Sequence, residues 1–314
     1  MNNSDNYQRK NKGRNKKTKA NLSPALALFV VFCAIIWFVG AYVISASRQE
    51  SLPFNDSFNY VAPLSQDIVR FNASYGTQTL TYEQLAQISN DHLLLVNRYY
   101  AVPSHVSFNL VEVSSHVWTL NPDLLLDEYV LIRLRMMFDS AANVGFTQFR
   151  VTEGFRTLAH QQTLYNSMAG TGLAAPPNHS EHQVGFAVDI SYQGVNIGNS
   201  RQGTWLMTNS YRYGFILRYP AHKTEITGFP FEPWHYRYVG QPHAYFMHRN
   251  DLVLEEYIDF LQRNREISIK HNGVIYTIFY LASVYDSIEI PINYLHSASL
   301  DNTGGIIVTV WGNN

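Results

Sequence analysis

The sequence contains a single cysteine, Cys33, among its 314 residues. Disulfides are therefore excluded from the chain beyond that position, and so is a cysteine nucleophile. Charged residues are also scarce, at 15% of the chain, whereas 46% of the residues are hydrophobic. This composition excludes overall disorder and is typical of a globular chain with one sizeable core and an accessory unit.

Basic charge is concentrated at the N-terminus. Seven of the 23 Lys and Arg residues fall within the first 20 residues, where Asp5 is the one acidic residue. The rest of the chain holds the other 16 basic residues and 23 of the 24 acidic ones, so it is net acidic. This distribution argues against a nucleic-acid partner.

An uncharged run of 25 residues extends from Leu22 to Ala46. It is long enough to cross a bilayer as a helix, and the basic tail before it places the N-terminus in the cytoplasm. A cleavable signal peptide is the rival interpretation, but its apolar core is about 7 to 15 residues long. We therefore expect a single-pass protein of the cell membrane with the bulk of the chain outside the cell.

The chain divides into five predicted segments. These are a basic cytoplasmic tail (1–21), a transmembrane anchor (22–46), a polar stem (47–81), a main globular domain (82–263) and a small β-rich appendage (264–314). Apolar spacing and turn residues predict buried strands at 93–96, 146–152, 215–218 and 236–239, helices at 124–144, 157–168, 204–213 and 252–263, a hairpin around Asn272-Gly273 and a last strand at 306–310.

Several catalytic motifs are missing. The sequence has no Gly-x-Ser-x-Gly elbow, no Ser-x-x-Lys motif of the penicillin-binding type and no phosphate-binding Gly-x-x-x-x-Gly-Lys-Ser. The His-Glu-x-x-His motif of the commonest zinc proteases is missing as well. Serine acyl-enzyme chemistry and the commonest zinc-protease helix are therefore disfavoured.

Two segments that follow or begin predicted strands combine residues used in metal hydrolases. In 180–189, His182 and Asp189 lie on either side of a glycine, and a turn followed by a strand can return both to one point. The segment 153–156 reads Glu-Gly-Phe-Arg at a strand end and is followed by Gln161 on the next predicted helix.

A third segment, 232–235, places Glu232 and His235 on either side of a proline and a tryptophan. The proline favours an extended backbone at Glu232. Because residues three apart on an extended chain face opposite sides, we expect an irregular bend that turns both side chains into one cleft.

These residues fit the chemistry of a zinc hydrolase. Catalytic zinc takes three protein ligands and leaves one position open for water, and His182, Asp189 and His235 supply that set. Glu232 is the candidate carboxylate that takes a proton from water and passes it to the leaving amine. Arg156 is the candidate for stabilising an oxyanion or gripping a substrate carboxylate.

Some of these residues also have possible structural roles. Arg156 could instead form an ordinary salt bridge with Glu153. His179 is a rival histidine ligand, although the set above is complete without it. His243 and His248 are expected on the surface of a helix.

The motif Ser-x-His-x-x-Gly-x-x-x-Asp at 180–189, together with Glu-Pro-Trp-His-Tyr-Arg-Tyr-Val-Gly at 232–240, resembles the VanY-type zinc D-alanyl-D-alanine carboxypeptidases. The resemblance covers roughly residues 90–312. Further similar stretches are Gly154-Phe155-Arg156 with Gln161, Tyr213 to Pro220, Leu254 to Tyr257, and Ile306 to Val310.

The resemblance implies a role for each matching residue: His182, Asp189 and His235 as zinc ligands (Zn2+), Glu232 as catalytic base, Arg156 facing the transition-state oxyanion, and Ser180 and Gln161 as substrate contacts near the terminal D-residue. Two departures affect the pocket wall. Phe155 stands where tyrosine is usual, and Asn178-His179 replace a frequent Gly-Tyr, which bears on substrate preference more than on catalysis.

The implied fold is α+β of the D,D-peptidase/hedgehog type, a small antiparallel sheet flanked by helices with zinc in a cleft, here with a transmembrane helix and a β appendage added. The implied reaction removes the C-terminal D-alanine from peptidoglycan pentapeptide stems. Removing the terminus that vancomycin-type antibiotics bind would give resistance, and ordinary wall trimming uses the same reaction.

Other activities stay open at this point. A D,D-dipeptidase, an L,D-carboxypeptidase or a peptidoglycan endopeptidase would share the zinc ligands and differ in the pocket. A non-catalytic wall-binding module is the alternative from another class. Such a module has no need of a carboxylate like Glu232 beside the metal, so this residue favours an enzyme.

Overall fold

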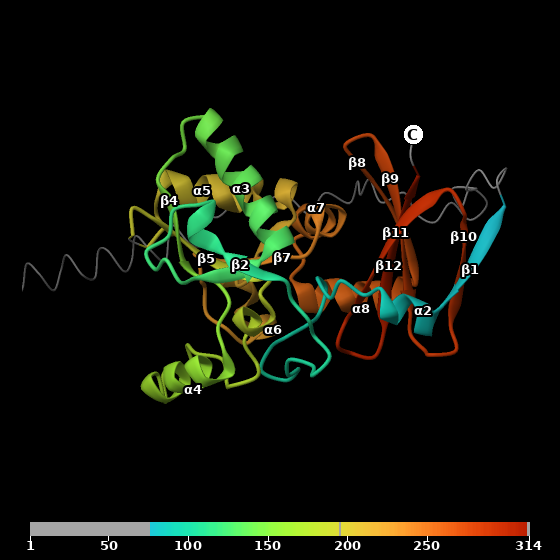
Figure 1. Cartoon of the computed structure of the whole chain (residues 1–314), viewed down its shortest axis with the longest axis horizontal. Coiled ribbons are helices and arrows are strands. Elements are labelled where there is room, and N and C mark those ends of the chain that lie inside the picture. The colour runs from blue at the N-terminus through green and yellow to red at the C-terminus, as the bar shows by residue number, and fades with distance from the viewer. Residues whose placement is uncertain (1–75, 195, 313–314) are drawn as a thin grey trace, which may run out of the picture. The chain divides into compact units, whose positions relative to one another are not determined.

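Figure 1 shows a computed structural model of the chain, which describes residues 76–194 and 196–312. The predicted tail, the predicted membrane span and residues 47–75 of the predicted stem lie outside the described residues. Within the described ranges, no helix has the length and hydropathy that a membrane crossing requires. The described part is an α+β fold with small antiparallel sheets.

A four-stranded antiparallel sheet carries two of the three predicted metal ligands. Its order is β4-β5-β7-β6, and the strands are Phe149–Glu153, Ala187–Tyr192, His235–Tyr238 and Phe215–Leu217. The strands predicted at 146–152, 215–218 and 236–239 are thus confirmed, with shifted ends.

Helix α3 (Glu128–Asn143) covers one face of this sheet (Figure 1). Asp127 caps it, because its Oδ1 accepts the backbone N–H of Tyr129 at 3.0 Å and that of Val130 at 3.3 Å. The cap explains why the helix predicted from 124 begins later: the residues before it form β3 (Leu125–Asp127), which pairs with β2 (Leu110–Glu112).

The alternation of side chains along each strand separates an apolar face from a polar one. Val188 of β5 and Tyr236 of β7 pack into the core beneath α3. The residues next to them, Asp189, His235 and Arg237, therefore belong to the opposite face. The candidate site is built on that face.

The remaining helices of this region connect the strands. The helices predicted at 157–168 and 204–213 are confirmed as α4 and as α5 continued by a 3₁₀ turn. The connecting helices of this region are α4 (Leu158–Ser167), α5 (Arg201–Asn209), α6 (Thr224–Thr227) and the 3₁₀ helices η2 (Val113–Ser115), η3 (Glu181–Val184), η4 (Ser210–Tyr213) and η5 (Ala221–Lys223).

A second four-stranded antiparallel sheet follows near the C-terminus. Its order is β11-β12-β9-β8, and the strands are Tyr294–Leu300, Ile306–Gly312, Val274–Leu281 and Glu266–His271. The hairpin predicted at Asn272-Gly273 joins β8 to β9, with φ of 50° and 82° at the two turn residues. These positive angles suit the tight turn that such a pair favours.

Residues far upstream complete this C-terminal region. Residues 77–81, expected in the stem, form β1 (Thr77–Thr81) and pair with β10 (Ser287–Pro291) (Figure 1). The next helix, α2 (Tyr82–Gln87), buries Leu85 in a cluster with residues of β9 to β12. The C-terminal sheet therefore shares its core with Leu85, at the start of the domain predicted at 82–263.

Helices α7 (Gln241–Arg249) and α8 (Leu254–Asn264) contribute to one core with residues of β8 and β9. The prediction that His243 lies on the surface is wrong. Its ring is buried, with Nδ1 2.7 Å from the hydroxyl of Tyr257 and Nε2 3.0 Å from that of Thr309. His248 is half-buried and stacks on Tyr211 at 4.0 Å between ring centroids.

The segment 93–96 is buried as predicted, but the strand assignment is wrong. Its backbone groups bond to separate partners and not to one neighbouring strand. The N–H of Leu95 donates to the carbonyl of Asp301, and Arg237 Nη2 donates to the carbonyls of His92 and Leu94 at 3.0 and 2.9 Å. An apolar run cannot by itself distinguish this arrangement from a strand, because both are buried.

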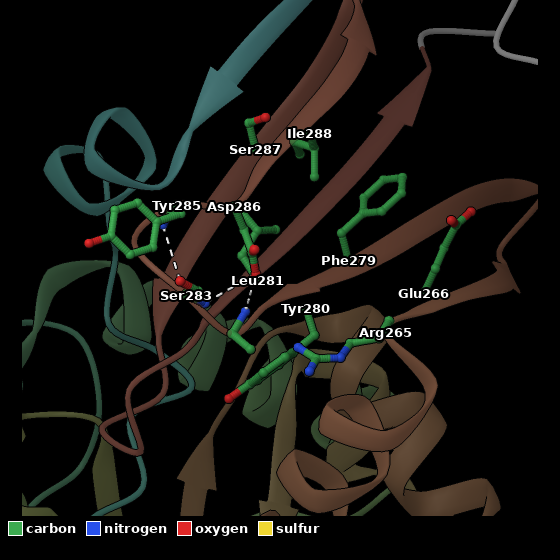
Figure 2. A pocket seen from close by; sticks show the side chains of 11 residues that line it. Arg265, Glu266, Phe279, Tyr280, Leu281, Ser283, Tyr285, Asp286, Ser287 and Ile288 are labelled. Atoms are coloured by element: carbon green, nitrogen blue, oxygen red, sulfur yellow. Dashed lines mark hydrogen bonds between the residues drawn. The ribbon is translucent and has the colours of Figure 1, made fainter.

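An open hollow of about 650 Å³ lies on the C-terminal region, beside β8, β9 and β10 (Figure 2). Its side chains include Arg265, Phe279 and Tyr285, and the last of these is 94% exposed. Asp286 holds the adjoining turn by accepting the N–H groups of Ala282 and Ser283. None of the predicted site residues lines this hollow.

We expect the free energy of unfolding to fall less on acidification in His243→Gln than in the parent protein. Burial lowers the pKa of His243 to about 3, below the value of about 6.5 in an unfolded chain. The stability from the neutral ring is complete above pH 6.5 and is lost as the pH falls toward 3, because unfolding then takes up a proton.

Urea unfolding between pH 4 and 7.5 measures this effect. One proton taken up on unfolding gives a slope of about 1.4 kcal/mol per pH unit, and the variant should lack this contribution. Equal slopes for parent and variant would show that His243 is not held neutral in the folded state.

Candidate metal centre

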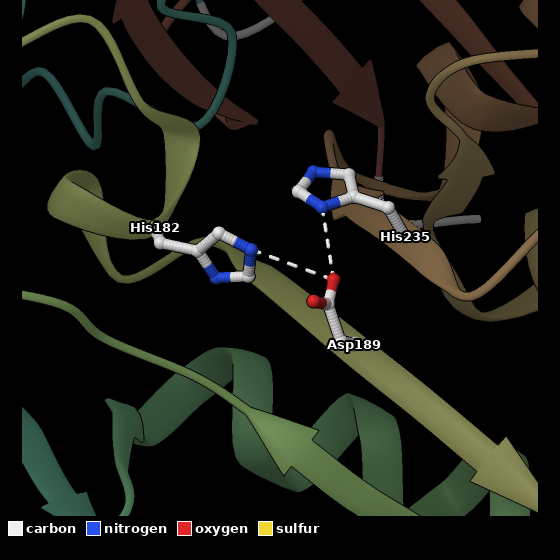
Figure 3. A group of neighbouring side chains, drawn as sticks. All are labelled: His182, Asp189 and His235. Atoms are coloured by element: carbon white, nitrogen blue, oxygen red, sulfur yellow. Dashed lines mark hydrogen bonds and ion pairs between the residues drawn. The ribbon is translucent and has the colours of Figure 1, made fainter. Parts of the chain in front are cut away.

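Three predicted ligands converge on one point. The donor atoms of His182, Asp189 and His235 all lie within 4.8 Å of one another. Asp189 Oδ1 is 3.0 Å from His235 Nδ1 and 3.4 Å from His182 Nε2, and Figure 3 shows the carboxylate facing both rings. Side chains from two distant stretches of sequence are therefore close enough to bind a single ion.

The strand register produces this convergence. Asp189 of β5 lies directly opposite His235 of β7. His182 lies in η3, and Gly185 ends that turn with φ of 73°, a conformation that glycine adopts without a steric penalty. The chain then enters β5, so the turn and strand expected from 180–189 are confirmed.

Gly154 fixes the orientation of His182. The Nδ1 of His182 lies 2.8 Å from the Gly154 carbonyl oxygen, which can only accept a hydrogen bond, so Nδ1 donates to it and Nε2 is the nitrogen that faces Asp189. A Cβ at position 154 would lie 2.4 Å from the carbonyl oxygen of Leu125, which excludes any larger residue without a backbone shift.

The bend expected around Pro233 is confirmed. The N–H of His235 donates to the carbonyl of Glu232 at 3.1 Å and closes a turn. The Glu232 side chain is half-buried and does not belong to the three-donor cluster. Burial raises the pKa of Glu232 to about 7, opposed by His235 and assisted by the negative charge of Asp189.

The chain resembles known proteins over this region and beyond it. A family model described as VanY, D-alanyl-D-alanine carboxypeptidase, matches residues 123–241. The D-alanyl-D-alanine carboxypeptidase of Enterococcus faecium is 36% identical over 273 residues, which cover 84% of this chain and 88% of that protein. The chain belongs to the VanY family. The resemblance inferred from the motifs, and the enzyme class it implied, are thus confirmed.

Two solved structures are also similar to this VanY-family chain. The vancomycin resistance D,D-dipeptidase VanXYg, in complex with a D-Ala-D-Ala phosphinate analogue, is 30% identical with a TM-score of 0.63, covering 75% of this chain and 98% of that one. A VanY D,D-pentapeptidase variant from a VanB-type resistance cassette, in complex with Zn(II), is 36% identical with a TM-score of 0.47, covering 53% and 98%.

The donor set of this VanY-family chain fits zinc. Two imidazole nitrogens and one carboxylate oxygen are ligands that catalytic zinc sites use, and three protein ligands leave a position open. His179 is not part of the cluster, because its Nδ1 lies against the carbonyl oxygen of Asn97 at 2.8 Å.

Arg156 is held in place by two neighbours. Its Nη1 donates to Gln161 Oε1 at 2.8 Å and its Nη2 to Glu153 Oε2 at 3.1 Å. Gln161 is buried and its amide nitrogen donates to the carbonyl of Ala175 at 2.7 Å. The structure therefore uses Gln161 to orient Arg156, and a direct contact of Gln161 with substrate stays a prediction.

Ser180 is also engaged within the protein. It is buried, and its hydroxyl accepts the backbone N–H of His182 at 3.4 Å as the N-cap of η3. This cap helps to fix the turn that carries His182. A substrate contact of Ser180 stays a prediction as well.

A buried carboxylate behind His235, that of Glu181, is not among the site residues predicted from the sequence. Glu181 Oε2 lies 3.3 Å from His235 Nε2, and Glu181 Oε1 accepts from Arg218 and Arg237. A signal was present in the sequence: Arg218 follows the apolar run Phe215-Ile216-Leu217, and an arginine that ends a buried strand needs a buried carboxylate as partner.

The charges around the cluster act strongly on its members. Burial pushes the pKa of Asp189 upward, but the two histidines override it and hold the pKa well below its ordinary value. Burial lowers the pKa of His235, but Asp189 and Glu181 reverse this and raise it to about 9. The carboxylate of Asp189 is therefore ionised, as a metal ligand must be.

We expect His182→Ala to lose bound metal, because one of three donors is removed. Zinc content after dialysis, measured by atomic absorption, should fall from about one ion per chain to well below that. His179→Ala is the matched control, since His179 lies three residues away and outside the cluster. Full zinc retention by His182→Ala would exclude this residue as a ligand.

Proposed function

We propose that this protein is a zinc-dependent D,D-carboxypeptidase that removes the C-terminal D-alanine from peptidoglycan pentapeptide stems, with His182, Asp189 and His235 as the zinc ligands. The observation that carries the proposal is the compact cluster of three donors with the separate carboxylate of Glu232 close by. The similar VanY pentapeptidase was solved with Zn(II), the metal that the donor types favour.

Glu232 is the general base of the proposed reaction. Zinc, when bound, supplies Lewis acidity that activates water and polarises the scissile carbonyl. Glu232 takes a proton from the attacking water and then donates it to the nitrogen of the leaving D-alanine. Burial favours this cycle, because a carboxylate with a pKa of about 7 both accepts and releases a proton near neutral pH.

Arg156 stabilises the negative charge that develops on the carbonyl oxygen, or binds the substrate carboxylate. Its guanidinium stays protonated and is fixed by Glu153 and Gln161. A charge that is oriented beforehand needs no reorganisation during the reaction. The salt bridge with Glu153 and a role toward substrate are therefore compatible.

The proposed location is the outer face of the cell membrane. The uncharged run 22–46, with the basic tail before it, supports a single-pass anchor with a cytoplasmic N-terminus. Stem peptides ending in D-alanine are exposed on that side. Hydrolysis there would remove the terminus bound by vancomycin-type antibiotics, and ordinary wall trimming is the alternative use of the same reaction.

A D,D-dipeptidase is the second candidate. The observation that favours it is the similarity to VanXYg, which is described as a vancomycin resistance D,D-dipeptidase. The same donors and the same base serve both reactions, and the two differ in how much of the peptide the pocket admits.

We expect Glu232→Gln to keep zinc and to lose turnover by about 10²- to 10⁴-fold, because general acid–base catalysis is removed. The measurements are zinc content and the rate of D-alanine release. Glu225→Gln, which changes an exposed glutamate of α6, is the control and should match the parent. A fully active Glu232→Gln variant would refute the assignment of the base.

We expect release of a single alanine from a UDP-linked pentapeptide and no reaction with the tetrapeptide. Mass spectrometry of both substrates after incubation distinguishes the candidates. Cleavage of free D-alanyl-D-alanine to two molecules of D-alanine, without release of alanine from the pentapeptide, would favour the dipeptidase. Shortening of the tetrapeptide would favour an L,D-carboxypeptidase.

A further inference from the structure

A buried carboxylate sits directly behind one of the proposed zinc ligands. The side chain of Glu181 has no exposed surface. Its Oε2 lies 3.3 Å from His235 Nε2, and its Oε1 accepts from Arg218 Nε at 2.8 Å and from Arg237 Nη1 at 2.9 Å. A buried charge is costly unless it is paired, and Glu181 is paired on both oxygens.

Both arginines are themselves fixed. Arg218 makes two further hydrogen bonds to Glu255 in α8, at 2.8 and 2.7 Å. Arg237 donates to the backbone carbonyls of His92 and Leu94. Because the guanidinium groups cannot move, the carboxylate between them is held at one position and in one orientation.

Glu181 faces the side of His235 that points away from the donor cluster. The nitrogen on the cluster side is Nδ1, which lies 3.0 Å from Asp189 Oδ1. A neutral imidazole carries one proton, on either nitrogen, and its other nitrogen is the lone-pair donor. The partner of Nε2 therefore decides whether Nδ1 is available to a metal.

We propose that Glu181 is a positioning residue for the metal centre: by accepting the Nε2–H of His235, it keeps the Nδ1 lone pair directed at the metal. This inference rests on the proposed function, since it assumes that His235 is a ligand. Carboxylates that accept the second N–H of a metal-binding histidine orient the ring, and their loss typically costs about 10- to 100-fold in metal affinity or activity.

Glu181→Gln tests the proposal because glutamine keeps the size of the side chain. Two arginine N–H groups already occupy Oε1, so the oxygen of the new amide faces the arginines and its NH₂ group faces His235 Nε2. His235 Nε2 then has to accept a hydrogen bond from the amide NH₂ group. The ring proton therefore moves to Nδ1, where it competes with the metal. We expect zinc affinity about 10- to 100-fold weaker, measured by competition with a chromophoric chelator.

Asp301→Asn is the matched control. Asp301 is a fully buried carboxylate of the C-terminal region that accepts from the hydroxyl of Tyr280 at 2.7 Å. Its loss perturbs a buried polar network whose hydrogen-bond partners, Tyr280, Thr303 and Gly305, include none of the three donors, and zinc affinity should equal that of the parent. The cobalt(II) absorption spectrum should likewise change in Glu181→Gln and stay unchanged in Asp301→Asn.

Glu181→Asp is the second variant, for the case that circular dichroism shows Glu181→Gln to be unfolded. It keeps the charge opposite the arginines but shortens the reach toward Nε2, so zinc affinity should again fall. Parent-like zinc affinity in either folded variant overturns the proposal.

Nitrogen-15 spectra of the zinc-loaded parent give a test that needs no variant. His235 should show a protonated Nε2 and a metal-shifted Nδ1, and the reverse pattern overturns the proposal. If the parent protein binds no zinc at all, the proposed function fails instead. Zinc binding with D-alanine release by the parent, together with an unaffected Glu181→Gln, refutes the positioning role alone.

Discussion

The pairing of β5 with β7 is the constraint on which the site depends. It sets Asp189 opposite His235 and turns both away from the core beneath α3. A slip of one residue in this pairing would exchange the two faces of the strand and bury the carboxylate under α3. The apolar residues at alternate positions, such as Val188 and Tyr236, oppose that slip because they would lose their burial.

The polar face of the same sheet has to satisfy several buried charges at once. Glu181, Arg218 and Arg237 lie there with no exposed side-chain surface, and Glu255 of α8 completes the set of partners. Removing any one partner would leave an unpaired buried charge. The end of the fold that holds the donor cluster is therefore linked to α8, which itself packs against the C-terminal sheet.

Much of this organisation could be read from local patterns. Apolar periodicity located α3 and α8, and Asn272-Gly273 located a hairpin, because helices, strands and tight turns each impose a short repeat or a specific residue type. The errors occurred where burial has no periodic signature. The apolar run 93–96 is covered without being a strand, and His243 is enclosed by Tyr257 and Thr309, which lie 14 and 66 residues further along the chain.

By itself, the sequence determined which residues are proposed to carry the chemistry: two histidines, an aspartate and a glutamate in two motifs, with an arginine in a third. Only the tertiary structure decided how those side chains are oriented. The carbonyl of Gly154, which fixes His182, and the carboxylate of Glu181, which lies behind His235, are 28 and 54 residues away along the chain from the rings that they contact. Orientation depends on contacts between residues distant in sequence, and a linear pattern of residue types does not contain them.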